Sequence, residues 1–281
     1  MDRGVVEDRS KKSTSDTSFW ENKSCGSEFS KSEKYSFDYF EEIENYRYLT
    51  EPEIFSFAQF TRFHKKKVLE VGYGAGTDFI QWIRAGAIAY GIDITTEGYN
   101  NLVNRLKVYD LKAEDIKISD SENIPYPDNF FDLVYSWGVI HHTSDTFGAL
   151  KEIIRVCGIN GKCKIMVYNR HSLNSLYLWI KKAFLKGKFW KSFSWCIYNF
   201  MESTGTKAFT KKEILNMLKN MPVSNIKIKT ILTFYDKLGK HNKFIRMIAA
   251  IMAFILNEAN VGWFLTIEFE KIPVENIDKN C

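Results

Sequence analysis

The sequence predicts an α/β fold in which a seven-stranded, mostly parallel sheet has helices on both faces and an antiparallel strand at one edge. Two observations support this fold class. Between Val68 and Tyr168, short apolar runs alternate with helical segments, which is the pattern of parallel strands joined by helical crossovers. After the crossovers stop, Trp263–Lys271 alternates apolar and polar residues, as expected for an antiparallel pair at the edge.

Each element follows from its local pattern. Strands are expected at Val68–Val71, Ile88–Ile94, Ile116–Ser119, Phe131–Ser136, Lys162–Tyr168, Ile226–Leu232 and Trp263–Lys271. Helices are expected at Glu53–Phe63 just after Pro52, and at Thr77–Ala85, Glu97–Tyr109, Asp145–Val156 and Thr210–Lys219. Thr210 and Glu213 have the spacing of a capping box. The crossovers between parallel strands should be right-handed.

Composition limits the class of protein. A chain of 281 residues can form one large domain with a cap. The net charge of +5 is mild and gives no strong indication of a nucleic-acid partner. Five scattered cysteines and no secretory signal favour a cytoplasmic protein with reduced thiols. The apolar run Met247–Leu256 is too short for a bilayer span of about 20 residues, so a buried or interfacial helix is expected.

The chain divides into five expected segments. Residues 1–18 are a polar tail, expected to be disordered, and residues 19–63 an aromatic-rich helical lead-in. Residues 64–171 form the core, residues 172–206 a cap insertion, and residues 207–281 the rest of the core sheet.

A glycine-rich turn follows the first strand, with the sequence Glu70-Val71-Gly72-Tyr73-Gly74-Ala75-Gly76-Thr77. Glycines let the backbone turn sharply and let a ligand approach closely. A dinucleotide fingerprint needs glycine where Thr77 stands. Glu70 would repel a pyrophosphate but suits a ligand that carries ammonium and sulfonium groups. Asp93 closes the second strand, where it is placed to accept both hydroxyls of a ribose.

Four stretches resemble the class I S-adenosylmethionine (SAM) dependent methyltransferases, particularly the small-molecule branch called methyltransferase type 11. They are VLEVGYGAGTD, YGIDIT, SDSENIPYPDNFFDLVYSWGVIHH and ALKEIIRVCGINGKCKI, within residues 67–168. The resemblance implies a Rossmann-like fold, SAM as cofactor and methyl transfer as the reaction. One stretch departs from the family: Leu-Lys-Pro-Gly-Gly is common before the fifth strand, where this chain has residues 156–161. Asn160-Gly161 still favours a tight turn there.

The same resemblance implies a set of cofactor-binding residues. The glycine-loop residues Glu70, Gly72, Tyr73, Gly74 and Gly76 would lie at the methionine end, Asp93 and Ile94 at the ribose, Asp120 and Ser121 at the adenine, and Ser136 and Trp137 beneath the sulfonium. Taken singly, Asp93 is equally compatible with a helix cap and Asp120 with a turn residue. The interpretation therefore depends on the whole set.

Candidates for catalysis follow the fourth strand. Methyl transfer is an in-line displacement for which proximity supplies about 7–11 kcal/mol, so a base is needed mainly where the acceptor loses a proton. His141 is the first candidate for acceptor contact or base and His142 the second, because both lie at the carboxyl edge of the sheet. A histidine that only fixes the loop is the alternative. Tyr168 and His171 are weaker candidates.

No metal site is expected. Cys157 and Cys163 bracket the turn before the fifth strand, and a thiolate pair could bind a soft metal. A pair of buried, idle thiols is the favoured interpretation.

The cap bears on the substrate. Leu173–Met201 combines nine aromatic residues with five lysines. It is interpreted as a lid over the acceptor, as a basic amphipathic surface that contacts a membrane or a lipid-linked substrate, or as ordinary packing against the sheet. Trp20, Tyr46 and Tyr48 from the lead-in are expected to close the other side of the pocket.

The leading hypothesis is a methyltransferase that acts on oxygen or nitrogen of a small molecule, such as a sugar, a lipid-linked compound or a specialised metabolite. One alternative is a SAM-binding module without catalysis. The other is a nicotinamide-dependent oxidoreductase, which Thr77 and Glu70 disfavour. No nucleic-acid partner is expected, because the Asn/Asp-Pro-Pro-aromatic tetrad of base-methylating enzymes is absent after the fourth strand and no Pro-Cys dipeptide occurs. The sequence does not indicate the oligomeric state.

Overall fold

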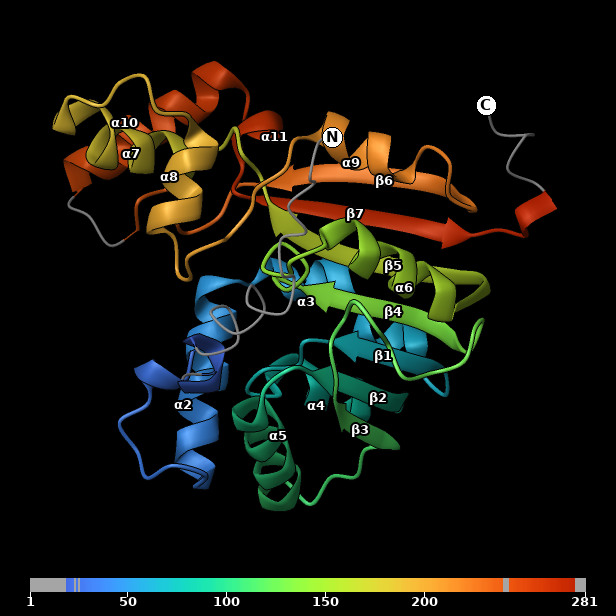
Figure 1. Ribbon diagram of the computed structural model, residues 1–281. Coiled ribbons are helices and arrows are strands. Elements are labelled where there is room, and N and C mark those ends of the chain that lie inside the picture. The colour runs from blue at the N-terminus through green and yellow to red at the C-terminus, as the bar shows by residue number, and fades with distance from the viewer. Residues whose placement is uncertain (1–18, 23, 25, 240–242, 276–281) are drawn as a thin grey trace, which may run out of the picture.

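A single seven-stranded sheet forms the centre of the computed structural model, which describes residues 19–22, 24, 26–239 and 243–275 (Figure 1). The strands are β1 Lys67–Val71, β2 Ile88–Asp93, β3 Asp115–Ile118, β4 Phe131–Trp137, β5 Cys157–Tyr168, β6 Val223–Ile231 and β7 Phe264–Lys271. Their order is β3-β2-β1-β4-β5-β7-β6. The first five strands are parallel, and β7 runs antiparallel to both of its neighbours. The predicted fold class is confirmed.

Helices cover both faces of this sheet. They are α2 Phe37–Thr50, α3 Glu53–Ala58, α4 Thr77–Arg84, α5 Thr96–Val108, α6 Thr146–Val156, α7 Leu173–Lys182, α8 Phe193–Phe200, α9 Lys211–Leu218, α10 Lys243–Leu256 and α11 Glu258–Val261. Short 3-10 helices occur at Ser27–Phe29, Phe60–Phe63 and Phe184–Lys186. The capping box at Thr210 and Glu213 is present as predicted. The expected helix at Glu53–Phe63 is split, because Gln59 adopts a left-handed conformation with φ of 58°.

Strand alternation separates two hydrophobic cores. In β1, Leu69 and Val71 face the core formed with α6 and α9, whereas Val68 faces the core formed with α3, α4 and α5. All three of these side chains are fully buried. Because successive side chains point to opposite faces, strands with two buried faces are apolar almost throughout.

The turn predicted before the fifth strand lies inside β5 instead. Asn160 is left-handed with φ of 62°, and the pairing of β4 with β5 shifts register between Phe131 and Leu133. A side chain at Gly161 would meet the backbone oxygen of Phe131 at 2.9 Å. The Asn-Gly pair therefore forms an irregularity that lets the strand pass close to its neighbour, rather than a turn that precedes it.

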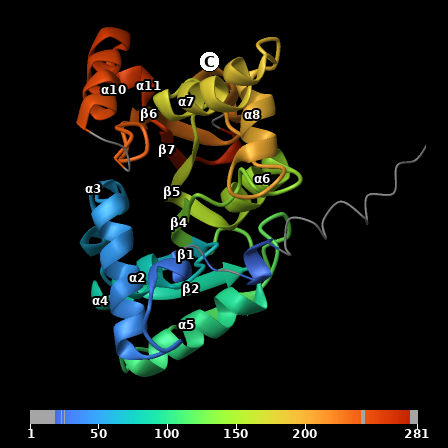
Figure 2. The same ribbon diagram turned by 90° about the vertical axis from the view of Figure 1, so that its left-hand side faces the viewer.

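The cap and α10 lie together at one end of the molecule (Figures 1 and 2). Residues 172–206 contain α7, the 3-10 helix Phe184–Lys186 and α8, and α7 contacts both α8 and α10. The apolar run Met247–Leu256 belongs to α10, and most of its side chains are exposed, which contradicts the buried alternative and leaves the interfacial one as a prediction. Within the described ranges, no helix is long and apolar enough to cross a membrane. The five-segment division stays a prediction, and residues 1–18 are outside the described part.

Candidate active site

A cavity opens at the carboxyl edge of the parallel strands, where ligands of open α/β sheets bind. It extends from the glycine loop after β1 to the ends of β4 and β5 and is bordered by the lead-in. The predicted site residues that line it are Glu70, Gly72, Tyr73, Gly74, Asp93, Ile94, Asp120, Ser121, Trp137 and His142, and the weaker candidate Tyr168 also lines it. Of the three lead-in aromatic residues expected at the cavity, Trp20 lines it, whereas Tyr46 and Tyr48 do not.

The glycine loop presents bare backbone to the cavity. Gly72 and Gly74 have φ of 78° and 51°, conformations that side chains rarely adopt. A Cβ at Gly72 would collide with Val139, whereas a Cβ at Gly74 would meet nothing within 4 Å. Gly72 therefore serves close packing, and Gly74 faces open space where a ligand can approach the chain.

Hydrogen bonds from the glycine loop and from Thr95 hold the Asp93 side chain in place. Its carboxylate accepts hydrogen bonds from the backbone N–H of Gly74 (2.8 Å) and from the N–H and hydroxyl of Thr95 (3.0 and 2.7 Å). Burial raises the pKa of Asp93, although these hydrogen bonds oppose the shift. A carboxylate has about four acceptor positions, so capacity for a ligand hydroxyl remains.

Glu70 is buried beneath the loop. Trp82 Nε1 donates to one of its oxygens at 2.9 Å. Burial raises the pKa of Glu70 well above its usual range, and the neighbouring charge of Asp78 adds to the effect. A cationic group in the cavity would stabilise its ionised form.

Asp120 and Ser121 form the opposite wall after β3. Asp120 accepts from the backbone N–H of Glu122 at 2.9 Å, as a turn residue does, and still lines the cavity. Partial burial raises the pKa of Asp120. Both interpretations of this residue, turn former and ligand contact, are therefore compatible with the geometry.

Three predicted residues do not line the cavity. Gly76 is left-handed with φ of 73°, and a Cβ there would press on Leu102 of α5, so it serves helix packing. Ser136 and His141 are completely buried. Successive residues of a strand point to opposite faces, which directs Ser136 away while Trp137 lines the cavity. His171 also lies outside the lining.

The two histidines have different surroundings. The His141 ring packs against Tyr168 in a tilted arrangement with ring centroids 4.0 Å apart, and burial lowers the pKa of His141 well below the usual range. His142 lines the cavity, and its Nδ1 lies 3.1 Å from Ser203 Oγ and 3.2 Å from Thr206 Oγ1. Burial, helped by the charge of Lys207, lowers the pKa of His142 to about 3. His142 is thus neutral at physiological pH and is a weak proton acceptor.

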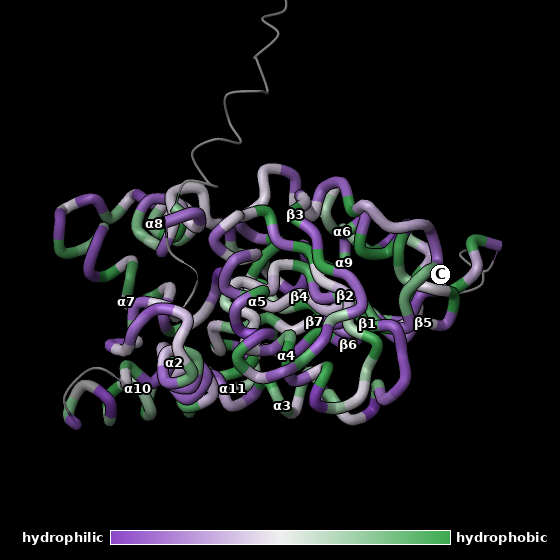
Figure 3. Tube along the Cα trace, turned by 90° about the horizontal axis from the view of Figure 1, so that it is seen from below, coloured by the Kyte–Doolittle hydropathy of each residue, from purple (hydrophilic) through white to green (hydrophobic). Residues whose placement is uncertain are grey.

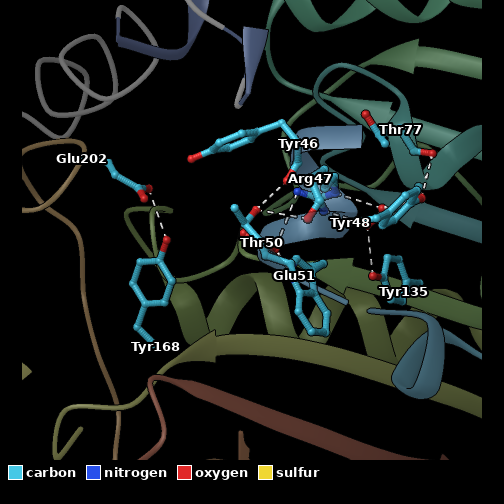
Figure 4. Close-up of polar contacts among 11 residues, drawn as sticks. Tyr46, Arg47, Tyr48, Thr50, Glu51, Thr77, Tyr135, Tyr168 and Glu202 are labelled. Atoms are coloured by element: carbon cyan, nitrogen blue, oxygen red, sulfur yellow. Dashed lines mark hydrogen bonds and ion pairs between the residues drawn. The ribbon is translucent and has the colours of Figure 1, made fainter. Parts of the chain in front are cut away.

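An ion-pair network that the sequence analysis missed joins the lead-in to the core (Figure 4). Arg47 of α2 donates two hydrogen bonds to Asp78 of α4, at 2.9 and 2.7 Å. The hydroxyls of Tyr48 and Tyr135 each donate to the same carboxylate at 3.2 Å. Asp78 is buried, so this network fixes α2 against the start of α4.

Two further carboxylates line the cavity near the ends of β4 and β5 (Figure 4). Glu51 accepts from Trp137 Nε1 at 2.8 Å, and burial raises the pKa of Glu51. Glu202 accepts from the Tyr168 hydroxyl at 3.2 Å. Desolvation raises the pKa of Glu202 to about 7, and the charge of Glu51 contributes. The Glu202 side chain is exposed, so water around it opposes the upward shift.

The charges around the cavity are strongly unbalanced. Seven carboxylates line it: Glu51, Glu70, Asp78, Asp93, Asp120, Glu122 and Glu202. Among the described lining residues, Arg47 is the single lysine or arginine, and it is paired with Asp78. Such a cavity favours ligands that carry positive charge.

Two other features take no part in this cavity. The Cys157 and Cys163 thiols are buried and free, and no group of three metal-binding side chains occurs among the described residues. None of the nine aromatic side chains of Leu173–Met201 lines the cavity. The interpretation of the cap as an aromatic lid therefore finds no support in these contacts.

Comparison with known proteins agrees with this arrangement. Residues 69–165 match the family described as "Methyltransferase domain". The matched region carries a methyltransferase domain, and together with the sheet order it supports a class I SAM-dependent methyltransferase. SAM is accordingly its cofactor. No curated protein is significantly similar in sequence.

Solved structures share the fold of this methyltransferase at low sequence identity. A Haemonchus contortus phosphoethanolamine N-methyltransferase, solved with phosphomonomethylethanolamine and S-adenosylhomocysteine, is 15% identical with a TM-score of 0.54. The match covers 77% of this chain but 52% of that enzyme. A Haloferax volcanii putative methyltransferase, in complex with the activator Trm112, is 13% identical with a TM-score of 0.55 over 82% of this chain and 94% of the other.

The [4+2]-cyclase SpnF is 14% identical with a TM-score of 0.52 over 87% of this chain and 86% of the other. A fold that also occurs in a cyclase does not specify a reaction or an acceptor. These must be argued from the cavity itself.

Proposed function

We propose that this methyltransferase transfers the methyl group of SAM to nitrogen or oxygen of a small molecule, and that the preferred acceptor is an amine. The observation that carries the proposal is the pair of carboxylates, Glu51 and Glu202, on the acceptor side of the cavity. The aromatic rings of Trp137, Tyr168 and Phe264 line the same region. Carboxylates and aromatic faces both attract an ammonium group.

The cofactor would occupy the glycine-loop half of the cavity. Glu70 would balance its ammonium group, Asp93 would accept from the ribose hydroxyls, and Asp120 with Ser121 would contact the adenine. The open space beside Gly74 and the bare backbone of the loop support this assignment. When bound, SAM supplies a methyl group on a positively charged sulfur, which is already activated for displacement.

Glu202 is the residue we assign as proton acceptor. A bound ammonium must lose a proton before its nitrogen can attack a methyl carbon, and a base with a pKa near the working pH suits that step. The pKa of Glu202, about 7, meets this condition, whereas that of His142, about 3, does not. Tyr168 orients the Glu202 carboxylate. This assignment replaces the histidines as base and leaves His142 as an acceptor contact.

The negative charge of the cavity also disfavours an acceptor that carries a phosphate group. The Haemonchus contortus enzyme was solved with an acceptor that carries a phosphate. In the described lining of the present cavity, the lone arginine is already paired, so a phosphate would meet mainly carboxylates. We therefore expect an amine without a phosphate.

Radiolabelled SAM tests the proposal directly. Label transfer would be measured with matched sets of primary and secondary amines, their hydroxyl counterparts and their phosphorylated forms. We expect turnover with unphosphorylated amines. Turnover confined to hydroxyl or phosphorylated compounds would overturn the amine assignment, and SAM binding without turnover on any set would contradict the proposed transfer.

A further inference from the structure

The helix α10 exposes an apolar surface that no described residue of the chain covers. Seven of its large hydrophobic side chains are exposed: Phe244, Met247, Ile248, Ile251, Phe254, Ile255 and Leu256. Phe254 is 81% exposed and Ile255 is 69% exposed. Ala249 and Ala253 are buried, and Ala253 packs with Leu173 and Val261 in a small cluster. A helix that is apolar on most of its circumference is normally buried, so this one needs a partner.

The neighbouring cap continues the same surface. In the turn between α7 and α8, Leu185 is 70% exposed, Trp190 is 67% exposed, and Phe184 and Phe189 are also exposed. The helices α7, α8 and α10 lie together at one end of the molecule (Figures 2 and 3), and α7 contacts the other two. Scattered exposed hydrophobic residues are ordinary, but a contiguous group of this kind marks an interaction site.

The charge of this surface is uniformly positive. The segments 173–201 and 243–257 contain no aspartate or glutamate. Lysines of the cap surround its exposed aromatic residues: Lys181, Lys182, Lys186, Lys188 and Lys191. Lys237, Lys243 and Arg246 line a shallow groove beside Met247 at the start of α10.

We propose that α10 and the α7–α8 turn form a docking surface for an anionic lipid bilayer. Exposed Phe, Trp, Leu and Ile side chains beside lysine and arginine are the combination by which helices lie in the interface of a membrane. Tryptophan is favoured at the level of the headgroups. The positive charge decides between occupants, because two copies of this surface would repel each other, whereas anionic headgroups attract it.

Two residues of the cavity belong to chain segments that adjoin these helices. Glu202 follows α8 by two residues, and Tyr235 lies in the segment before α10; both line the cavity. This proposal concerns where the enzyme binds and does not depend on the identity of the acceptor.

Vesicle flotation with the full chain tests the proposal. Vesicles of phosphatidylcholine alone would be compared with an equimolar mixture of phosphatidylcholine and phosphatidylglycerol. We expect binding to the mixed vesicles that falls with added salt, and weak binding to the neutral ones. The double variant F254S/I255S should reduce binding to mixed vesicles at least tenfold, and K186A should reduce it about fivefold, as expected for one lysine near an anionic surface.

The matched control is L49S, since Leu49 of α2 is 80% exposed but lies away from this surface. It should bind vesicles like the unmodified chain. Both the control and F254S/I255S should keep the unmodified affinity for SAM, which separates docking from folding. Equal binding by F254S/I255S and the unmodified chain would overturn the proposal. So would a dimer in solution that this double variant dissociates, because a second copy would then be the occupant.

Discussion

The two halves of the cavity are built in different ways. The half that we assign to the cofactor is formed by residues at the ends of β1, β2 and β3, where short stretches of sequence supply the loop, Glu70 and Asp93. The half that we assign to the acceptor is formed by residues from separate segments. Glu51 comes from the lead-in and Glu202 from the cap, and each is held by a hydrogen bond to a core strand residue, Trp137 or Tyr168.

This difference suits a fold in which one half of the cavity is built from the shared backbone and the other half from variable segments. The cofactor half uses backbone geometry that any member of the fold must reproduce, whereas the acceptor half depends on side chains that insertions bring to the sheet edge. Arg47 and Asp78 connect the two halves, because α2 carries Arg47 and α4 begins at the glycine loop. The substitutions below test this division, starting from the connection.

Removing the connection should have the largest effect. D78A would leave Arg47 without its buried partner and the Tyr135 hydroxyl without its acceptor, and would remove one of the two acceptors of the Tyr48 hydroxyl. Breaking a buried pair of this kind costs about 3–5 kcal/mol in the free energy of unfolding. Urea denaturation should show a loss of this order. The surface pair Lys66–Asp132 provides the control, since K66A should cost less than about 1 kcal/mol. Equal losses would mean that Asp78 does not join the halves.

On the acceptor side, E202Q should lower kcat about 100-fold without changing the affinity for SAM, because general bases contribute about that factor or more. The carboxylate accepts a proton only when ionised. With a pKa of about 7, the kcat of the unmodified enzyme should therefore rise with pH through neutrality. That rise should be absent in E202Q. A pH profile that survives the substitution would assign the proton to another group.

On the cofactor side, D93A should weaken SAM binding at least tenfold in calorimetry. The substitution removes the acceptor for the backbone N–H of Gly74 as well as the expected contact with the ribose. D110N is a suitable control, because Asp110 is exposed in a left-handed conformation that asparagine tolerates. Unchanged affinity in D93A would count strongly against the ribose assignment.

The sequence predicted the cofactor half more completely than the acceptor half. Strands, crossovers and the glycine loop are local patterns, so Glu70, Gly74 and Asp93 could be placed on one sheet edge from spacing alone. The sequence pattern does not show which side of a loop a residue faces. Gly76 therefore packs on Leu102, and His141 is buried behind the lining that His142 joins.

The acceptor half depends on contacts between distant segments. Trp137 and Glu51 are separated by 86 residues and Tyr168 and Glu202 by 34. No periodicity relates such positions. The one available signal was the spacing of Arg47 and Glu51, which places them on the same side of a helix. For α10, the apolar run was visible, but burial is the ordinary outcome for such a run, and its exposure depends on how few partners the cap supplies.

The smallest effect is expected from alanine substitutions at two glycines that have similar backbone conformations but lie in different parts of the molecule. Gly74 and Gly187 are both left-handed, with φ of 51° and 67°, and a Cβ at either would meet nothing within 4 Å. G74A and G187A should therefore cost a similar amount in the free energy of unfolding, about 1 kcal/mol, from backbone strain. SAM affinity should fall severalfold in G74A and stay unchanged in G187A, because Gly74 lines the cofactor half whereas Gly187 lies in the cap. If both variants bound SAM normally, the glycine loop would act only in folding, and the open space beside Gly74 would not be where the cofactor approaches the chain.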